Sequence, residues 1–138
     1  MQRHMQNTEA VVAFLASHPM VERVGHPLLD SHPSHALAKK LLPRGAGSVF
    51  SFDIKGSREQ GKAFVETLKV FSHLANVGDC RSLVIQPAST THFRMDTAAL
   101  KQAGISPGTI RLSIGLEDAD DLIDDLKRAL RAAEKVGA

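Results

Sequence analysis

An arginine interrupts an otherwise apolar strand pattern in the last third of the chain. The run Ile110-Arg111-Leu112-Ser113-Ile114 alternates branched aliphatic residues with polar ones, which predicts a strand with one buried face. A guanidinium has the planar fork that binds a carboxylate through two hydrogen bonds, and a strand is a rigid mount for it. An arginine in such a strand more often points to solvent, so the pattern by itself leaves both interpretations open.

A second candidate is the loop Asn76-Val77-Gly78-Asp79, which combines an amide, a glycine and a carboxylate. It precedes an apolar run at 83–85 that predicts a buried strand. Loops anchored on buried strands commonly carry binding residues. Composition alone gives equal weight to a binding loop and to a plain turn.

Three of the seven histidines, His26, His32 and His35, share one proline-rich loop, and His32-x-x-His35 is the spacing of a chelate. Zinc sites add cysteine or carboxylate ligands at characteristic spacings, and only Asp30 is near. We interpret this segment as a polar surface loop and predict no metal site.

The single cysteine, Cys80, offers a nucleophile pair with His73 or His92. A small, partly buried thiol is the more common role of a lone cysteine. The chain has no glycine-rich phosphate loop of the G-x-G-x-x-G or G-K-[ST] type. We therefore predict no catalytic and no cofactor-binding residue in this chain.

The bulk composition is that of one globular domain, which we place at residues 1–138. Hydrophobic residues make up 43%, whereas aromatic residues make up 4% with no Tyr or Trp, so we expect an aliphatic core. A net charge of +2 argues against nucleic acid or a membrane as partner. One cysteine excludes an intrachain disulfide, and with no secretory signal we expect a cytoplasmic protein.

Strand and helix patterns alternate along the chain. Strands are predicted at 21–24, 45–55, 83–85 and 110–114, and helices at 3–18, between Ser34 and Pro43, after the capping-box pair Ser57 and Gln60, and at 96–103. The last helix carries an apolar stripe, acids in its first turns, bases in its last turns and an expected Asp124–Arg128 pair. This order predicts an α+β fold, an α/β sandwich with a small sheet covered by helices.

Three motifs occur in order along the chain. They are N-V-G-D-C-R-S-L at 76–83, Q-P-A-S-T-T-H at 86–92 and I-R-L-S-I-G-L-E-D at 110–118, with V-E-R-V-G-H-P at 21–27 and S-H-P at 31–33 upstream. Together they resemble the C-terminal domain of the Cys/Met-metabolism enzymes that depend on pyridoxal phosphate (PLP), and within these the O-acetylhomoserine sulfhydrylases. The resemblance implies their small domain, with a mostly antiparallel sheet and helices packed on one face.

The resemblance also implies roles for two residues. Arg111 matches the arginine that binds the substrate α-carboxylate, and Asn76 matches the Ser or Asn beside it. The family's Schiff-base lysine follows Ser or Thr in an S-x-T-K-type motif, and none of the eight lysines here does. PLP thus belongs to the full-length family, while the lysine and most of the cofactor cradle correspond to a PLP-binding large domain that this chain does not contain. One departure is Gln86, where the family commonly has His.

These implications define the expected function. The chain resembles the substrate-binding domain of an enzyme that replaces the acetoxy group of O-acetylhomoserine with sulfide to give homocysteine in methionine and cysteine metabolism. It is expected to be inactive alone. The alternatives are an assembly module that completes a separate chain with the PLP lysine or self-associates, a domain of the cystathionine γ-synthase or methionine γ-lyase type, and a stand-alone ligand-binding domain.

Overall fold

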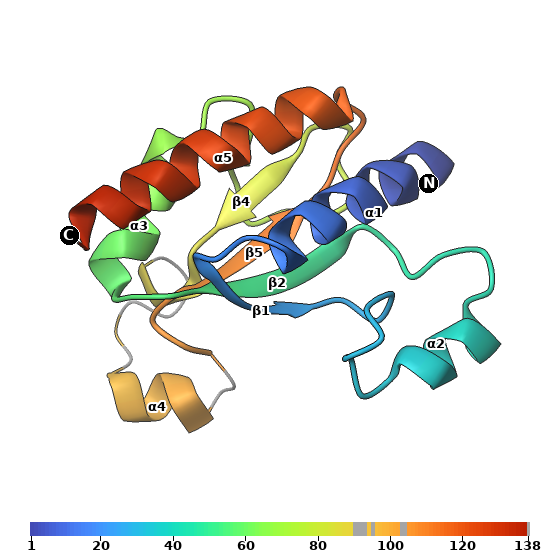
Figure 1. Cartoon of the computed structure of the whole chain (residues 1–138), viewed down its shortest axis with the longest axis horizontal. Coiled ribbons are helices and arrows are strands. Elements are labelled where there is room, and N and C mark those ends of the chain that lie inside the picture. The colour runs from blue at the N-terminus through green and yellow to red at the C-terminus, as the bar shows by residue number, and fades with distance from the viewer. Residues whose placement is uncertain (90–93, 95, 103–104, 138) are drawn as a thin grey trace.

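The computed structural model describes residues 1–89, 94, 96–102 and 105–137. Over these residues five strands form one sheet in the order β1-β2-β5-β4-β3 (Figure 1). Neighbouring strands are antiparallel except β3 and β4, which are parallel. The predicted α+β fold with a mostly antiparallel sheet is confirmed. The strands are β1 (Val21–Gly25), β2 (Val49–Ile54), β3 (Ser72–His73), β4 (Leu83–Ile85) and β5 (Thr109–Ser113).

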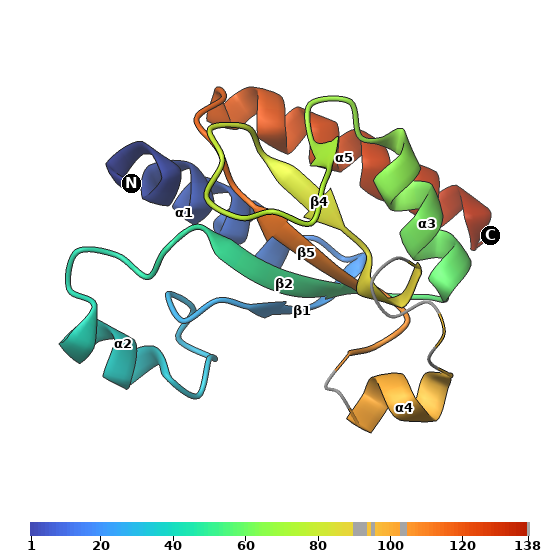
Figure 2. The ribbon, with the colours of Figure 1, turned by 180° about the vertical axis from the view of Figure 1, so that it is seen from behind.

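Three helices cover one face of the sheet, as Figures 1 and 2 show from opposite sides: α1 (Gln2–Ala16), α3 (Arg58–Thr67) and α5 (Ala119–Val136). Two short helices, α2 (His35–Leu41) and α4 (Thr97–Gln102), lie away from that layer, and the 3-10 turn η1 (Pro87–Ser89) follows β4. The expectation of helices packed on one face is confirmed for the three long helices. No helix in the described part of the chain is long and apolar enough to cross a membrane.

The core lies between the sheet and these three helices. Along β2 and β5 every second side chain is buried against the helices, because successive residues of a strand point to opposite faces. Helix α5 packs its apolar face against this side of the sheet. The central members are Phe50, Phe52, Ile54, Ile110, Leu112, Ile114, Leu122, Leu126, Ala129 and Leu130.

The sheet differs from the sequence-based expectation mainly at the start of β2 and in the extra strand β3. The strand predicted at 45–55 begins only at Val49, because Gly45 and Gly47 have φ values of +129° and +87° that a strand does not accept. Strand β3 was not predicted, since two residues are too few to show a period. It forms because β4 offers a free edge for parallel pairing.

One predicted ion pair is wrong. Arg128 pairs with Asp125, three residues before it, and Asp124 lies 4.0 Å from Lys127 instead. Asp125 is 1% exposed, and its carboxylate also accepts the backbone N–H groups of the segment 69–71 at the end of α3. The carboxylate therefore fastens α5 to the α3–β3 connection.

His26 is a fully buried imidazole after β1. Its Nδ1 accepts the backbone N–H of Leu28 at 3.2 Å, and its ring meets Phe50 edge-on with centroids 5.7 Å apart. Burial lowers the pKa of His26, with a smaller lowering from His32 opposed by the Gly47 backbone and Glu9. The folded state thus holds His26 neutral at pH values where the unfolded chain protonates it.

We expect the free energy of unfolding to fall as the pH drops below about 6.5, because the unfolded state then binds a proton that folded His26 refuses. A single such group changes the free energy of unfolding by at most about 1.4 kcal/mol per pH unit. In a His26→Asn variant, whose amide oxygen can still accept the Leu28 N–H, the slope should shrink. Urea denaturation between pH 7 and pH 5 measures it.

His18 provides the matched comparison, since burial lowers its pKa as well, with Glu134 acting in the opposite direction. His18 is half-buried whereas His26 is fully buried. His18→Asn should therefore remove a smaller part of the acid sensitivity. A slope unaltered by His26→Asn would contradict the assignment.

Candidate carboxylate-binding site

Arg111 sits in the middle of the sheet, on the face opposite α1, α3 and α5. Its strand β5 pairs with β2 and β4, which places Arg111 beside Ser51 on one side and Ile85 on the other. We call this side of the sheet the second face; its polar members are Arg23, Ser51, Asp53, Thr109 and Arg111. Arg111 lies on it because its neighbours Ile110 and Leu112 are fully buried against the helices.

The Arg111 side chain is held by the backbone at one edge. Its Nη2 donates a hydrogen bond of 2.8 Å to the carbonyl oxygen of Ala75, in the loop between β3 and β4. A guanidinium carries five N–H groups, so the bond to Ala75 leaves most of them for a ligand. The arrangement fixes the direction of the cation and leaves a free edge suited to a carboxylate.

Asn76 follows Ala75 directly and is exposed. The structure thus brings both predicted substrate-binding residues to one place, with the Arg111 guanidinium bonded to the peptide unit that joins Ala75 to Asn76. The sequence separates them by 35 positions, and the link depends on the β3–β4 loop folding back over the end of β5.

The loop 76–82 is fastened to the end of β5 by several hydrogen bonds. The N–H of Gly78 donates to Ser113 Oγ at 3.2 Å, and the N–H of Leu116 donates to the carbonyl of Cys80 at 2.8 Å. Within the loop, the Arg81 N–H donates to Asp79 Oδ1, and this bond is the main reason that the Asp79 pKa is lowered. The loop that holds Arg111 is therefore itself held from several points.

Sequence reasoning missed the role of Glu117 and Ser82. Glu117 Oε2 accepts the Ser82 N–H at 2.7 Å and Oε1 accepts the Ser82 hydroxyl at 3.0 Å, while Ser82 Oγ accepts the Gly115 N–H at 2.8 Å.

From α1, Asn7 donates to the carbonyls of Gly115 and Glu117 at 3.1 and 2.7 Å, and His4 donates to Asp79 O at 3.1 Å. Except for His4 and Asn7, all the residues of these contacts lie in the motifs at 76–83 and 110–118. Their place in these motifs was the signal in the sequence that could have identified them.

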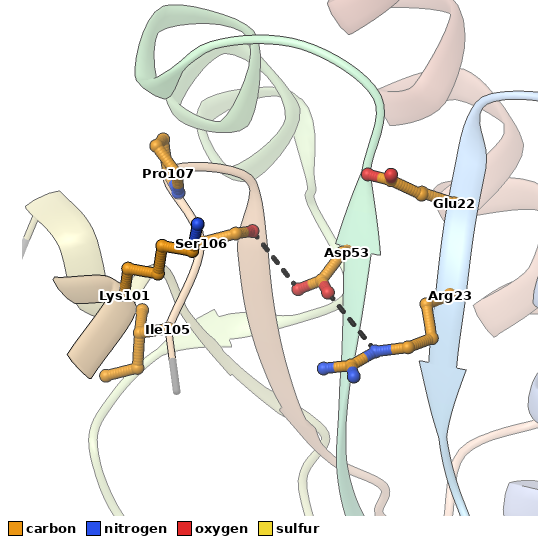
Figure 3. A pocket seen from close by; sticks show the side chains of 7 residues that line it. All are labelled: Glu22, Arg23, Asp53, Lys101, Ile105, Ser106 and Pro107. Carbon is orange, nitrogen blue, oxygen red and sulfur yellow. Dashed lines mark hydrogen bonds and ion pairs between the residues drawn. The ribbon is translucent and has the colours of Figure 1, made fainter. Parts of the chain in front are cut away.

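Beside Arg111 the second face is hollowed. A cavity of about 410 Å³ extends from Arg111 to Arg23 on β1, with Ser51 and Thr109 among its lining residues. A second hollow of about 570 Å³, drawn in Figure 3, adjoins it and shares Arg23, Asp53 and Ile105 with it. The two hollows form a trough along the second face that ends at Lys101 of α4.

Asp53 stands where the two hollows meet. Its Oδ1 accepts the hydroxyl of Thr109 at 2.6 Å. Figure 3 shows its two other contacts: Oδ1 accepts the Ser106 hydroxyl at 3.3 Å, and Oδ2 lies 3.4 Å from Arg23 Nε. Only 14% of its side chain is exposed. Its negative charge is thus compensated locally, and the terminal nitrogens of Arg23 extend beyond the pair.

Among the residues that the structure describes, the remaining sequence candidates do not come together in a site. His32 Nδ1 accepts the Ser34 N–H and His35 Nδ1 bonds the Pro27 carbonyl, and the described residues contain no group of three or more potential metal ligands. His73 donates to the Val65 carbonyl at 2.7 Å. Cys80 is exposed. Residues 90–93 of the second motif, including His92, lie outside the described residues.

The residues around Arg111 fit a carboxylate but do not fit PLP. A PLP site requires a lysine for the Schiff base and a partner for the pyridinium nitrogen. The cavity at Arg111 is lined by no lysine among the described residues, and Phe52, its aromatic member, has its side chain in the core. Lys101 lines only the adjoining hollow. The described residues around Arg111 therefore offer a cation for a carboxylate and no lysine for PLP.

Comparison with known proteins agrees with the motifs. The homocysteine synthase of Schizosaccharomyces pombe is 46% identical over 133 residues, which cover 96% of this chain and 31% of that protein. A crystal structure from Campylobacter jejuni, described as an O-acetylhomoserine (thiol)-lyase with a pyridoxyl-lysine at its position 205, is 45% identical with a TM-score of 0.85, covering 94% of this chain and 31% of its own.

Cystathionine γ-synthase of Xanthomonas oryzae, solved with aminoacrylate and cysteine, is 41% identical with a TM-score of 0.88, covering 98% of this chain and 35% of its own. The chain thus spans about a third of the length of the proteins it matches. Sulfhydrylases and a synthase match at similar identity, so the comparisons do not separate these activities. The family model for the Cys/Met metabolism PLP-dependent enzymes matches residues 1–131, and the chain belongs to that family.

Proposed function

We propose that this chain provides the substrate-carboxylate site of an O-acetylhomoserine sulfhydrylase, an enzyme that forms homocysteine by replacing the acetoxy group with sulfide. The observation that carries the proposal is the Arg111 guanidinium, tied to Ala75 O at one edge and open toward a cavity at the other. The sulfhydrylase and homocysteine synthase relatives support the choice of reaction.

In this proposal Arg111 binds the α-carboxylate of the amino-acid substrate through paired hydrogen bonds. Asn76, beside the Arg111–Ala75 contact, adds a side-chain donor to the same carboxylate. Binding at two points fixes the orientation of the substrate, which lowers the entropic part of the reaction barrier. The chain alone is inactive, because the lysine that forms the Schiff base with PLP belongs to the PLP-binding large domain.

That large domain is the proposed partner, either in a longer form of this chain or in a separate one. Helix α2 supports such a partner. It has no buried residue, and Leu37, Leu41 and Leu42 expose 56%, 64% and 50% of their surface. A helix of seven residues is too short to be stable without packing, so a covering surface is expected there.

The test is binding of O-acetylhomoserine to this chain, measured by titration calorimetry or by amide chemical shifts. Arg111→Gln should abolish measurable binding, and Arg111→Lys should weaken it roughly tenfold, because an ammonium keeps the charge but loses the fork. Asn76→Ala should weaken it less. Arg131→Gln, an exposed arginine on α5, is the control and should bind as the wild type does. Equal binding by wild type and Arg111→Lys would refute the assigned role.

A further inference from the structure

A buried amide on α1 connects this helix to the end of β5. Asn7 is 1% exposed, and its Nδ2 donates hydrogen bonds to the carbonyl oxygens of Gly115 and Glu117, 108 and 110 positions further along the chain. Figure 2 shows the first turns of α1 at the same end of the sheet as the turn from β5 into α5. Core packing alone does not account for this amide, because an apolar side chain would fill the position without the cost of burying a polar group.

The carbonyls that Asn7 holds belong to the turn that carries Glu117. The Glu117 carboxylate is half-buried and accepts both the N–H and the hydroxyl of Ser82, at 2.7 and 3.0 Å. Ser82 is fully buried, and its Oγ accepts the Gly115 N–H at 2.8 Å. Because Asn7 fixes the backbone of this turn, it determines where the Glu117 side chain begins and therefore where Ser82 is held.

Ser82 is the last residue of the loop 74–82, which orients Arg111. The loop includes Ala75, whose carbonyl oxygen accepts the hydrogen bond of Arg111 Nη2 at 2.8 Å. The carbonyl oxygen of Ser82 also accepts the N–H of Ser72, in β3, at 2.9 Å, so both ends of the loop are anchored at Ser82. A displacement of Ser82 would therefore move the whole loop and, with it, the carbonyl that directs the guanidinium.

We propose that Asn7 is a positioning residue for the carboxylate site, which holds the Arg111 guanidinium in its binding orientation through the loop 74–82. The inference rests on the proposed function, because it assigns Asn7 a role at the site where Arg111 binds the substrate carboxylate. Asn7 itself does not touch the substrate. It keeps the fork of Arg111 directed at the cavity before the ligand arrives, which lowers the cost of ordering the site on binding.

The experiment removes the two donors without changing the shape of the side chain. Asn7→Asp puts a second oxygen in place of the NH₂ group, so that a carboxylate faces the carbonyl oxygens of Gly115 and Glu117. We expect O-acetylhomoserine to bind this variant roughly tenfold more weakly in titration calorimetry, at a temperature where circular dichroism shows it folded. Gln6→Glu, at an exposed amide on the same helix, adds the same charge and should bind as the wild type does.

Nuclear magnetic resonance of the Arg111 side chain separates positioning from a general loss of stability. A guanidinium that is bonded to the Ala75 carbonyl rotates slowly, so its Nη protons give separate resonances, which their absence from Arg111→Gln assigns. In folded Asn7→Asp these resonances should merge, because the displaced loop releases the guanidinium. A variant that is only less stable would keep them separate in its folded state.

Glu117 gives a second route to the same contacts, which keeps the inference testable if Asn7→Asp does not fold. Glu117→Ala removes both acceptors of Ser82 and should weaken binding to a similar extent. Glu117→Gln should restore most of the binding, because its amide oxygen accepts the Ser82 N–H while its NH₂ group donates to Ser82 Oγ. Adding Asn7→Asp to Glu117→Ala should cause no further loss, because the two residues act through one path.

The outcomes distinguish this inference from the proposed function. If folded Asn7→Asp or Glu117→Ala binds as the wild type does while Arg111→Gln abolishes binding, Asn7 is not a positioning residue and the proposed function stands. If O-acetylhomoserine binds no better to the wild type than to Arg111→Gln, the proposed function fails. The Arg111 resonances then decide alone: merged resonances in Asn7→Asp show that Asn7 orients the guanidinium, and separate ones overturn that role.

Discussion

Replacing Asp125 with Asn is expected to lower the free energy of unfolding by about 3 kcal/mol, the cost of breaking a buried charge arrangement by removing one partner. The Asp125 carboxylate accepts the N–H groups of Lys69, Val70 and Phe71 and also contacts Arg128. An amide has the same shape, but its NH₂ group replaces one of the two acceptor oxygens, so either the backbone N–H groups or the Arg128 guanidinium then faces a donor instead of an acceptor. Urea denaturation at pH 7 measures the loss.

Asp124→Asn is the matched control, because it changes the neighbouring carboxylate on the same helix. The Asp124 side chain is 77% exposed and lies 4.0 Å from Lys127, a geometry that contributes less than about 1 kcal/mol. Its replacement should leave the unfolding midpoint nearly unchanged. Equal losses at the two positions would show that Asp125 acts only through the overall charge of α5.

The role of Asp125 illustrates what the sequence could and could not predict. The apolar stripe of the last helix predicted which face of α5 is buried, and Asp125 lies on that face, three residues after Leu122 and one before Leu126. An acid inside an apolar stripe was therefore a visible signal. Its partners at 69–71 were not visible, because backbone N–H groups leave no mark in the sequence.

The same distinction holds at the candidate site. The alternation around Arg111 predicted its strand and its side of the sheet, and the family resemblance predicted its ligand. The proximity of Arg23 depends on β1 pairing with β2 through a register shift between Val21 and Arg23, which no local pattern encodes. The residues of a strand can predict the strand itself. They cannot predict its register, and therefore not which residues of the other strands lie beside it.

A methyl group added at Gly115 should loosen the connection on which Arg111 depends. The Cβ atom of Gly115→Ala would lie 2.4 Å from the Cys80 carbonyl oxygen and 2.5 Å from the Arg81 carbonyl carbon, both of them backbone atoms. Neither the strand end nor the loop can yield by rotating a side chain. We expect a loss of about 1–3 kcal/mol in unfolding free energy, the usual cost of forcing extra volume into a packed region.

The Gly115→Ala substitution should weaken carboxylate binding as well as lower the free energy of unfolding. The loop that carries Cys80 also carries Ala75, whose carbonyl oxygen orients Arg111, so a displaced loop releases the guanidinium. We therefore expect Gly115→Ala to weaken carboxylate binding even under conditions where the variant is fully folded, as calorimetry at low temperature would show.

Gly137→Ala is the control for the added methyl group. Its Cβ would approach only the amide end of the flexible Gln60 side chain, and the position is at the end of α5. Moving that side chain costs at most its exposed capping bond to the Ser57 N–H, about 1 kcal/mol. Gly137→Ala should therefore lose little stability and should retain carboxylate binding. If Gly115→Ala behaves in the same way, the contact between Gly115 and the Cys80 loop does not position Arg111, and the cation would have to be held by its bond to Ala75 and by its place in β5 alone.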